Sequence, residues 1–259
     1  MGAKKTNRID FHTFYQELYP QRWELLKAAL AQQTQSVPFE ERLEKPYYLD
    51  EGSLLSARQL PLAEARQILD MCAAPGGKSL ILASRMSPDA HLICNDRSRN
   101  RRFRLHTVLD THLPPDIRQR VTITSHDATR WGLYEQNAYD AVLLDAPCSS
   151  ERHVLQDAAA LAQWTPARTK HLAVQQFAML ASALEAVTIG GYILYSTCSI
   201  SPLENEEVIG RLEKKRSGRY EEIPCVVPFA EACRHGYIIM PDTAEGRGPL
   251  YFCLLRRTA

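Results

Sequence analysis

The chain has 259 residues, and the hydrophobic 45% of them can bury one large core, or one core with a small appendage. A formal net charge of +1 excludes a uniformly basic nucleic-acid binder, so contact with nucleic acid needs local positive charge. The sequence has no run of 18 apolar residues that would span a bilayer, and its start lacks the apolar core of a signal peptide. We therefore expect a cytoplasmic protein that has no membrane partner.

The first 60 residues predict a short helical extension. Apolar residues recur at helical spacing between Phe11 and Leu30. The segment from Gln32 to Lys45 is polar and contains proline, which predicts a linker. We therefore expect an N-terminal helical extension over residues 1–60 and a larger domain over residues 61–259.

From about Ala65 the sequence alternates between strand-like and helix-like segments. This alternation predicts an α/β fold with a mostly parallel sheet and helices on both of its faces. Near the end, two strand-like runs without a helix between them predict an antiparallel hairpin at one edge of the sheet. The expected strands are Gln67–Met71, His91–Asn95, Val121–Ser125, Ala141–Asp145 and Tyr192–Ser196; the expected helices include Lys78–Met86, Arg99–Thr111 and Thr169–Val187; the hairpin joins Gly236–Met240 to Leu250–Arg256.

The seven cysteines indicate reduced thiols. Their number is odd, no C-x-x-C pair occurs, and several lie inside apolar runs typical of strands. These features argue against a disulfide framework and a zinc site, and they fit a reducing compartment. We therefore predict that the protein binds no metal.

A glycine loop follows the first expected strand. The run from Pro75 to Ser79 opens a helix whose free N–H groups suit a polar or anionic ligand, and its glycines allow close approach of the backbone. The run matches neither a Walker loop nor G-x-G-x-x-G, and taken alone it fits an ordinary turn equally well. Asp96 and Asp127 follow the next two strands, where carboxylates accept hydrogen bonds from a ribose and an adenine, although helix capping is the commoner role. Together these features predict an adenosine-containing cofactor without a pyrophosphate, such as S-adenosylmethionine.

Two cysteines stand just after apolar strands. Cys148 ends the run Asp145-Ala146-Pro147-Cys148, and Cys198 lies in Ser196-Thr197-Cys198-Ser199. Ligands of open α/β sheets bind at the carboxyl ends of the strands. Either cysteine alone is more often a buried structural thiol. Two strand-end thiols beside a nucleotide-type cofactor predict covalent catalysis on a base.

Four separated motifs resemble, in order and spacing, those of the Nop/Sun family of RNA cytosine-5 methyltransferases. They are CAAPGGK (72–78), ND with Arg101 (95–101), DAPCSS (145–150) and YSTCS with Asn205-Glu206, and the similarity spans roughly residues 50–256. The runs Glu151–His153 and Gly248–Cys253 look closest to the mitochondrial-type members that act on small-subunit rRNA. The resemblance implies a Rossmann-like, S-adenosylmethionine-dependent methyltransferase fold with a mostly parallel seven-stranded sheet.

The resemblance also implies a chemistry. The thiolate of Cys198 adds to carbon-6 of cytosine, which makes carbon-5 nucleophilic enough to take the methyl group. Cys148 helps to release the product, and Asp145 holds the N3 and N4 edge of the base. The expected cofactor contacts come from Cys72, Ala73, Ala74, Pro75, Gly76, Gly77, Lys78, Asp96, Arg101, Asp127 and Asp145.

Cys198 must be activated, because an ordinary cysteine is only a few per cent thiolate near neutral pH. The run from Ser201 to Glu204 predicts a helix start, with Ser201 as N-cap and Glu204 closing a capping box. The partial positive charge of that helix N-terminus would favour a thiolate at Cys198.

The expected substrate is RNA, either rRNA or tRNA, in which the target base is unstacked to reach Cys198. Near-neutral overall charge predicts modest affinity for free RNA, so recognition would use a folded rRNA surface, an assembling ribosomal particle or a recruiting protein. We expect a monomer. Two alternatives stay open: a non-catalytic RNA-binding assembly factor with the same fold, and a DNA cytosine-5 methyltransferase, a class that uses the Pro-Cys cysteine as nucleophile. Phosphate contacts are expected from part of an arginine cluster: Arg97, Arg99, Arg101, Arg102 and Arg104.

Overall fold

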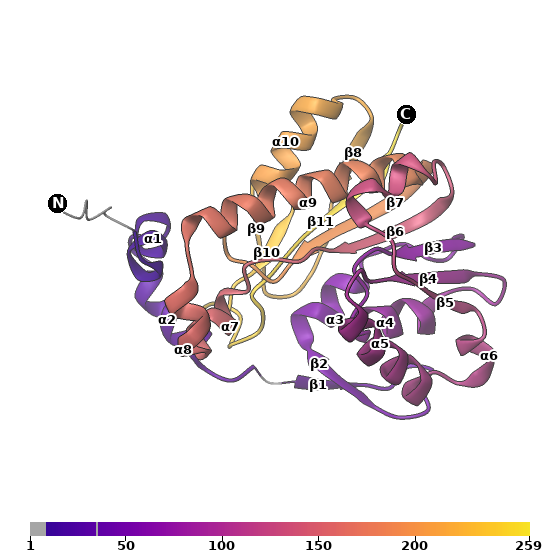
Figure 1. Ribbon diagram of the computed structural model, residues 1–259, viewed down its shortest axis with the longest axis horizontal. Helices are drawn as coiled ribbons and strands as arrows, with labels where there is room; N and C mark the ends of the chain where they lie inside the picture. Colours follow the sequence, from indigo (N-terminus) through magenta and orange to yellow (C-terminus); the bar gives the residue numbers. More distant parts are fainter. Residues whose placement is uncertain (1–8, 35) are drawn as a thin grey trace, which may run out of the picture.

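The computed structural model describes residues 9–34 and 36–259, so the first eight residues of the predicted extension lie outside the described residues. A nine-stranded sheet runs through the described chain in the order β5-β4-β3-β6-β7-β11-β10-β9, with β8 paired to β11 (Figure 1). The first five strands of this order are parallel, as predicted. They are β3 (Gln67–Asp70), β4 (His91–Asn95), β5 (Val121–Thr124), β6 (Tyr139–Asp145) and β7 (Val187–Thr197).

The other four strands are antiparallel to their neighbours. The predicted hairpin is present, because β10 pairs with β11, but β11 lies inside the sheet between β7 and β10. The two strands beyond the expected seven come from short, half-exposed segments that gain their partners only in the folded sheet: β8 on β11 and β9 on β10. The bounds are β8 (Tyr220–Ile223), β9 (Ala230–Ala232), β10 (Tyr237–Ile239) and β11 (Leu250–Arg257).

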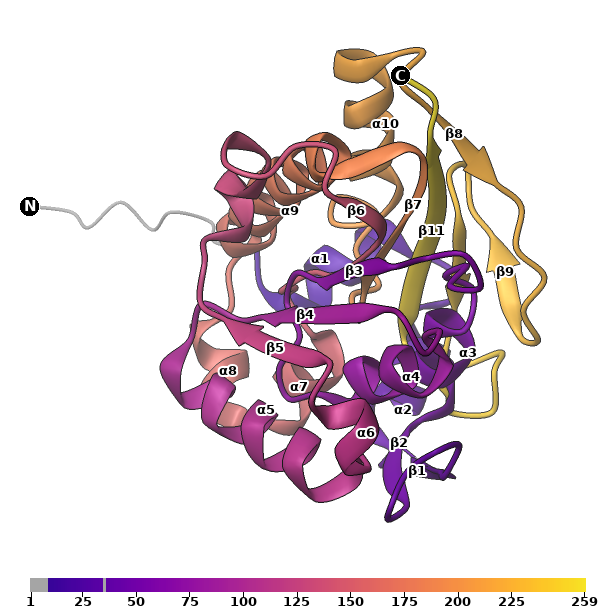
Figure 2. The ribbon, with the colours of Figure 1, turned by 90° about the vertical axis from the view of Figure 1, so that its right-hand side faces the viewer.

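Helices cover both faces of the sheet because the strands bury side chains on both sides. Ile68 and Leu69 of β3 are fully buried in two different apolar clusters, as alternate strand residues should be. Figure 2 shows α4 and α5 on one side and α9 on the other. The first face carries α3 (Glu51–Ala57), α4 (Gly77–Arg85), α5 (Arg99–His112) and α6 (Pro115–Arg118); the second carries η1 (Ala128–Leu133), α9 (Pro166–Ala186) and α10 (Glu206–Arg216).

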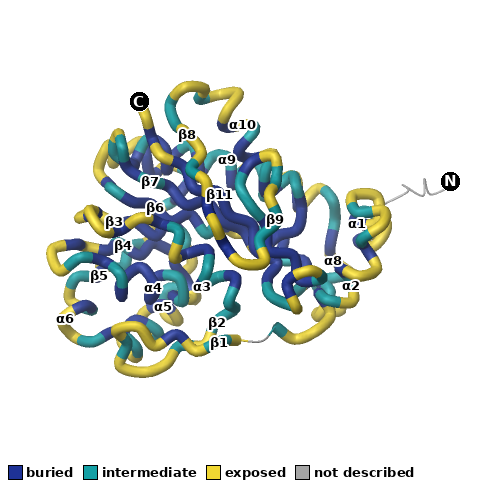
Figure 3. The backbone as a smooth tube through the Cα atoms, turned by 180° about the vertical axis from the view of Figure 1, so that it is seen from behind, coloured by how far each residue is buried: buried dark blue, intermediate teal, exposed yellow. Residues whose placement is uncertain are grey.

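In Figure 3, β6, β7 and β11 are buried over most of their length. The predicted α/β methyltransferase fold class is confirmed. Within the described ranges, the structure has no helix of the length and apolar character needed to cross a membrane.

The N-terminal region contains the predicted helices and one strand pair that the sequence did not reveal. Helices α1 (Phe11–Leu18) and α2 (Trp23–Ala31) bury Tyr15 and Trp23, whose rings stack at 5.4 Å. The predicted linker is wrong in part, since β1 (Ser36–Phe39) pairs with β2 (Tyr47–Asp50) as a separate two-stranded sheet. The sequence analysis missed this strand because it contains Pro38. Proline is tolerated in edge strands but argues against a strand in a sequence pattern.

One arginine connects the two ends of the described chain. Arg152, in α7 (Glu151–Gln156), donates to the carbonyl oxygens of Ala29 and Gln32 at 3.2 and 2.6 Å. The same guanidinium donates to the carbonyls of Gly246 and Gly248 at 3.0 and 3.1 Å. Arg152 therefore holds the end of α2 against the loop that precedes β11. The short helix α8 (Ala158–Gln163) follows α7.

Candidate active site

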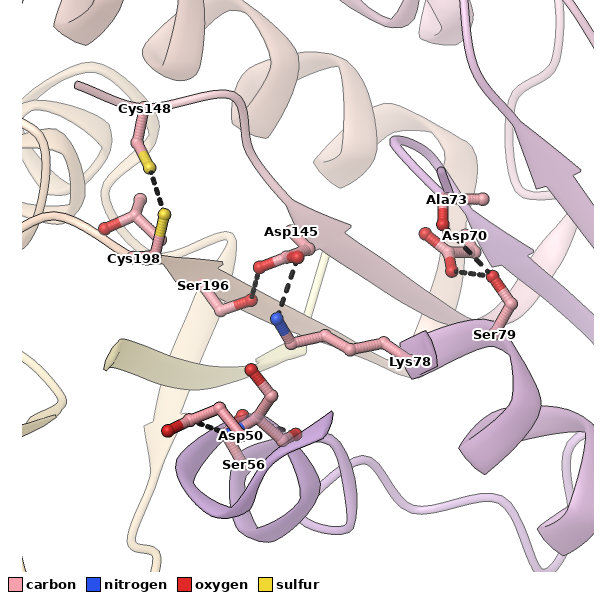
Figure 4. Close-up of polar contacts among 12 residues, drawn as sticks. Asp50, Ser56, Asp70, Ala73, Lys78, Ser79, Asp145, Cys148, Ser196 and Cys198 are labelled. Carbon is pink, nitrogen blue, oxygen red and sulfur yellow. Dashed lines mark hydrogen bonds and ion pairs between the residues drawn. The ribbon is translucent and has the colours of Figure 1, made fainter. Parts of the chain in front are cut away.

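The two strand-end cysteines meet at the carboxyl ends of β6 and β7. Asp145 and Ser196 are register partners in these parallel strands, so the loops that follow them run side by side. The sulfur atoms of Cys148 and Cys198 lie 2.9 Å apart as free thiols (Figure 4). Ser150, in a left-handed conformation at φ 54°, brings its Oγ to 3.5 Å from the first sulfur and 3.2 Å from the second. The predicted cysteine pair is thus assembled, together with a serine that the sequence analysis missed.

The environment distinguishes the two thiols. The pKa of Cys198 is lowered, first because Cys148 donates a hydrogen bond to its sulfur and then because Ser150 donates another. The pKa of Cys148 is raised well above its usual value for the complementary reason, reinforced by burial. Cys198 is also the exposed member of the pair. The arrangement therefore favours a thiolate on Cys198 and a protonated thiol on Cys148.

We expect Ser150→Ala to raise the pKa of Cys198, because the substitution removes a donor that stabilises the anion but not the thiol. Thiolate exists above the pKa, so the pH midpoint for alkylation of Cys198 by iodoacetamide should move upward. A hydrogen bond to a charged group stabilises by about 1.5–3 kcal/mol, so alkylation at neutral pH should slow by roughly tenfold or more. Peptide mapping by mass spectrometry gives this rate.

Ser53→Ala is the matched control, since Ser53 lines the same cavity as Cys198 but lies in α3. The control should leave the alkylation midpoint in place. An unchanged midpoint in Ser150→Ala would show that the Ser150 hydroxyl does not act on Cys198.

Asp145 forms an ion pair at the end of β6. Its carboxylate accepts from Lys78 Nζ at 2.8 Å and from Ser196 Oγ at 2.8 Å. Burial opposes a charge on Lys78, but Asp145 outweighs it, and the pKa of Lys78 is raised. Lys78 was expected in the cofactor loop, and the structure adds this contact with Asp145 (Figure 4). The pair places a fixed cation and anion near the sulfur atoms.

A cavity of about 640 Å³ opens at the ends of β3, β4 and β5, within the size range of cofactor sites. Among the predicted cofactor residues, its wall includes Cys72, Asp96, Arg101 and Asp127. The other predicted cofactor residues, Ala73–Lys78 and Asp145, are not part of that wall. An apolar side complements the two carboxylates: Met71, Ala128, Val174, Ala178 and Met179. This combination fits a nucleoside, because carboxylates can accept hydrogen bonds from its hydroxyl and amino groups while apolar side chains pack against its base.

The two cavity carboxylates also have local partners. Asp96 accepts from the Ser98 amide at 2.8 Å and lies 3.4 Å from Arg101 Nε. Asp127 is the N-cap of η1, and its pKa is lowered because the Thr129 hydroxyl and amide donate to it. Asp127 therefore has the capping role that was weighed for strand-end carboxylates, whereas the N-cap of α5 is Ser98. Both Asp96 and Asp127 line the cavity.

The glycine loop is shaped by packing against protein side chains. Gly76 has φ +123°, and a Cβ there would lie 2.9 Å from Val108 in α5. A Cβ on Gly77 would lie 2.8 Å from the ring of Tyr47 in β2. In the structure, the missing side chains of these glycines thus let the loop backbone lie close to α5 and β2. The Ala74 carbonyl in this loop accepts a hydrogen bond from Arg101.

We expect Gly76→Ala to destabilise the fold by about 2–4 kcal/mol, because it combines a strained positive φ with a steric conflict in the core. Urea unfolding gives this free energy, and cofactor affinity should fall with it. Gly218→Ala is the matched control, since Gly218 also has a positive φ (+75°) but has nothing within 4 Å of a new Cβ. Equal losses for the two variants would show that packing of the loop against α5 contributes nothing.

The predicted helix start at Ser201 is wrong. Helix α10 begins at Glu206 with Asn205 as N-cap, and residues 202–205 form a turn before it. The Glu204 side chain turns inward and accepts from the Ser149 amide at 3.0 Å and from Gln176 Nε2 at 2.9 Å. These long-range bonds replace the capping box, so the expected helix N-terminus beside Cys198 is absent. The lowered pKa of Cys198 comes instead from Cys148 and Ser150.

A second cavity, of about 320 Å³, opens on the exposed side of Cys198. Its wall includes Ser150, His153, Asp50 and Pro249. It brings together α3, α7 and the loop before β11, three segments that no local sequence pattern relates. Cys198 therefore lies where a group bound in this cavity reaches its sulfur.

Comparison with known proteins places the chain in a family. A family model described as 16S rRNA methyltransferase RsmB/F matches residues 57–255. A Xenopus laevis protein named 5-cytosine rRNA methyltransferase NSUN4 is 35% identical over 228 residues, covering 82% of this chain and 56% of the relative. A mouse protein named mitochondrial tRNA (cytosine(34)-C(5))-methyltransferase is 29% identical over 263 residues, covering 95% of this chain and 75% of the relative. The chain thus spans little more than half the length of the Xenopus relative.

Solved structures share the fold. A methyltransferase homologue from Pyrococcus horikoshii aligns with a TM-score of 0.71 at 21% identity, covering 95% of this chain and 93% of that one. NSun6 from the same organism aligns with a TM-score of 0.68 at 24% identity, covering 85% and 55%. The predicted S-adenosylmethionine cofactor is confirmed as that of the family. The chain belongs to the RsmB/F (Nop/Sun) family of RNA methyltransferases.

Proposed function

We propose that the protein transfers a methyl group from S-adenosylmethionine to carbon-5 of cytosine in RNA, through a transient bond between Cys198 and carbon-6. The observation that carries this proposal is the pair of free thiols at 2.9 Å, in which Cys198 is the exposed one and has a lowered pKa. Membership of an RNA methyltransferase family supports the reaction class. A merely structural cysteine pair needs neither an exposed thiol nor an activating hydroxyl.

The Cys198 thiolate attacks carbon-6 of the ring, and the electron pair of the C5–C6 double bond moves toward carbon-5. Carbon-5 is then nucleophilic enough to form a bond to the methyl carbon. S-adenosylmethionine would supply that methyl group from its sulfonium, and the methyl–sulfur bond that breaks would leave the neutral thioether S-adenosylhomocysteine. Carbon-5 next passes its proton to water, and the electron pair of its C–H bond restores the C5–C6 double bond. The bond between carbon-6 and sulfur breaks, and its electron pair returns to Cys198 as the thiolate. Cys148, protonated and 2.9 Å from Cys198, is placed to act in this release.

Asp145 is proposed to orient the base by its N3 and N4 edge. In the structure its two oxygens are engaged by Lys78 and Ser196, so binding a base requires sharing or exchanging one of these bonds. Lys78 Nζ pairs with the Asp145 carboxylate at 2.8 Å and balances negative charge beside the Cys198 thiolate. Bonds to a charged partner of this kind stabilise charge that develops on a ring.

The cofactor is proposed to occupy the 640 Å³ cavity. Asp96 and Asp127 offer carboxylate oxygens to the ribose and the adenine, and Arg101 holds the Ala74 carbonyl of the glycine loop. Cys72 and Met179 line the apolar side, with their sulfur atoms 3.9 Å apart. Residues 73–78 shape the loop through Gly76 and Gly77, so their proposed role is to form one border of the site.

The substrate is proposed to be rRNA or tRNA, because the two relatives named above act on one and the other. Partner recruitment, the monomeric state and the division into residues 1–60 and 61–259 stay predictions. The cytoplasmic location also stays a prediction, and the mouse relative is named as mitochondrial.

Bisulfite sequencing of RNA, with and without the gene, tests the proposal directly. We expect at least one cytidine in rRNA or tRNA to lose protection when the gene is absent. Purified protein should also methylate RNA and leave DNA of the same sequence unmodified. A protein that binds RNA but neither S-adenosylmethionine nor a methyl-accepting cytidine would instead be an assembly factor.

A further inference from the structure

Two fully buried carboxyl groups lie beneath the loops that carry the cysteines. Glu151 begins α7, and Glu204 lies in the turn before α10. Both contact the hydroxyl of Ser149, the residue after Cys148. Ser199, the residue after Cys198, lies 3.2 Å from that hydroxyl. The reaction proposed above uses neither carboxyl group, and buried acids need an explanation because isolated charges are costly in the interior.

Glu151 is surrounded by hydrogen-bond donors. Its Oε1 accepts from Tyr15 OH at 2.5 Å, from Ser199 Oγ at 2.9 Å and from Ser149 Oγ. Its Oε2 accepts from the Ile200 amide at 3.1 Å. Every partner donates, so both oxygens of Glu151 serve as acceptors, as in an ionised carboxylate.

Glu204 has a different pattern. Its Oε2 accepts from the Ser149 amide and from Gln176, whereas its Oε1 meets the Ser149 hydroxyl. That hydroxyl has a single hydrogen, so when it donates to Glu151, its contact with Glu204 is satisfied if Glu204 itself donates. The Ser199 hydroxyl, which donates to Glu151 at 2.9 Å, lies 3.4 Å from the same Glu204 oxygen. Burial first, and then the charge of Glu151, raise the pKa of Glu204 to about 7. Of the two carboxyl groups, Glu204 is therefore the one whose surroundings favour the protonated form.

We propose that Glu151 and Glu204 are positioning residues that share one proton through Ser149 and thereby fix the two cysteine loops against each other. The inference rests on the proposed covalent function. Ser149 and Ser199 each follow a cysteine directly, so a change in this network displaces a sulfur atom. Tyr15 extends the network to α1, which gives the N-terminal helices a direct connection to the active site.

The proposal predicts that one substitution has opposite results at the two positions. In Glu204→Gln, the amide oxygen accepts from Ser149 and Gln176 while the NH2 group donates to the Ser149 hydroxyl, so every bond is kept. In Glu151→Gln, the NH2 group must face either the Ile200 amide or the three hydroxyl donors. At least one buried donor then loses its acceptor, which costs far more than a lost surface bond.

The experiment measures single-turnover formation of the covalent complex with RNA that carries 5-fluorocytidine, at saturating RNA, together with the Kd of S-adenosylmethionine. We expect Glu151→Gln to slow the complex at least about tenfold with the Kd unchanged, and Glu204→Gln to slow it less than about threefold. Ser149→Ala should resemble Glu151→Gln, because it removes the shared hydroxyl. Glu185→Gln is the matched control, since Glu185 holds Arg219 at 2.6 Å at the other end of β7; it should lower the Tm without changing the rate.

Equal rates for Glu151→Gln and Glu204→Gln, whether both fast or both slow, would overturn the inference. If Glu151→Gln does not fold, the rates of Ser149→Ala and Glu204→Gln are compared instead. Equal rates for those two variants would also overturn the inference. The wild-type protein separates the two proposals. If it forms no complex, the covalent function fails, whereas a wild-type complex with no difference among the variants removes only the role of the carboxyl pair.

Discussion

Replacing Cys198 by alanine is expected to abolish the covalent complex with 5-fluorocytidine RNA and to reduce methyl transfer on the order of a thousandfold or more. Cys198 is the exposed sulfur, receives hydrogen bonds from Cys148 and Ser150, and has the lowered pKa. Among the described cysteines, Cys198 is the one in the wall of the smaller cavity. Transfer of labelled methyl groups and gel mobility of the RNA complex measure the two effects.

Cys233→Ala is the matched control for Cys198→Ala, because Cys233 is a half-buried thiol whose pKa burial raises. This control should keep full activity. Cys198→Ala should keep its affinity for S-adenosylmethionine, since Cys198 is not in the wall of the larger cavity. A covalent complex that persists in Cys198→Ala would assign the nucleophile to another residue.

Replacing Cys148 by alanine is expected to stall the reaction after the methyl group has moved. Cys148 is protonated and touches the attacking sulfur, so its loss leaves Cys198 bound to carbon-6 without a nearby thiol to assist release. Multiple turnover should fall by about a hundredfold, the typical contribution of a positioned acid or base, while natural RNA accumulates as a covalent complex. Denaturing gels with natural RNA detect that complex.

The double variant Cys148→Ala/Cys198→Ala is the control, and it should form no complex at all. Because Cys148 also donates to Cys198, its loss should raise the pKa of Cys198, so the first covalent step should need a higher pH. Normal turnover by Cys148→Ala, with no trapped RNA, would remove Cys148 from the release step.

The parallel half of the sheet could be predicted closely because its strands are buried on both faces. Such strands produce continuous apolar runs, and β4 has the predicted bounds. The strand β7 extends five residues before its predicted start, because Gly190 and Gly191 interrupt the apolar pattern that the folded sheet nevertheless pairs. The short strands β8 and β9 carry exposed, polar residues, and only their pairing to β11 and β10 defines them.

Some residues of the candidate site could also be predicted from the sequence, and others could not. Cys148, Cys198 and Asp145 could be placed because each lies at the end of a strand or within three residues after it. Ser150 could have been suspected from its position two residues after Cys148, but its left-handed backbone has no sequence signal. The role of Glu204 could not be predicted, because its partners Ser149 and Gln176 come from distant segments, and their bonds override the local capping pattern.

The bonds of Arg152 to both ends of the chain constrain how the molecule is made. The segment around Ala29 leaves the ribosome first, yet its partner Arg152 arrives about 120 residues later and the loop at Gly246–Gly248 later still. Contacts of such long sequence separation form late and slowly. The helix α2 therefore lacks the α7 partner on which it packs until residues 151–156 have been synthesised. Its link through Arg152 is complete only when the loop at Gly248 has followed.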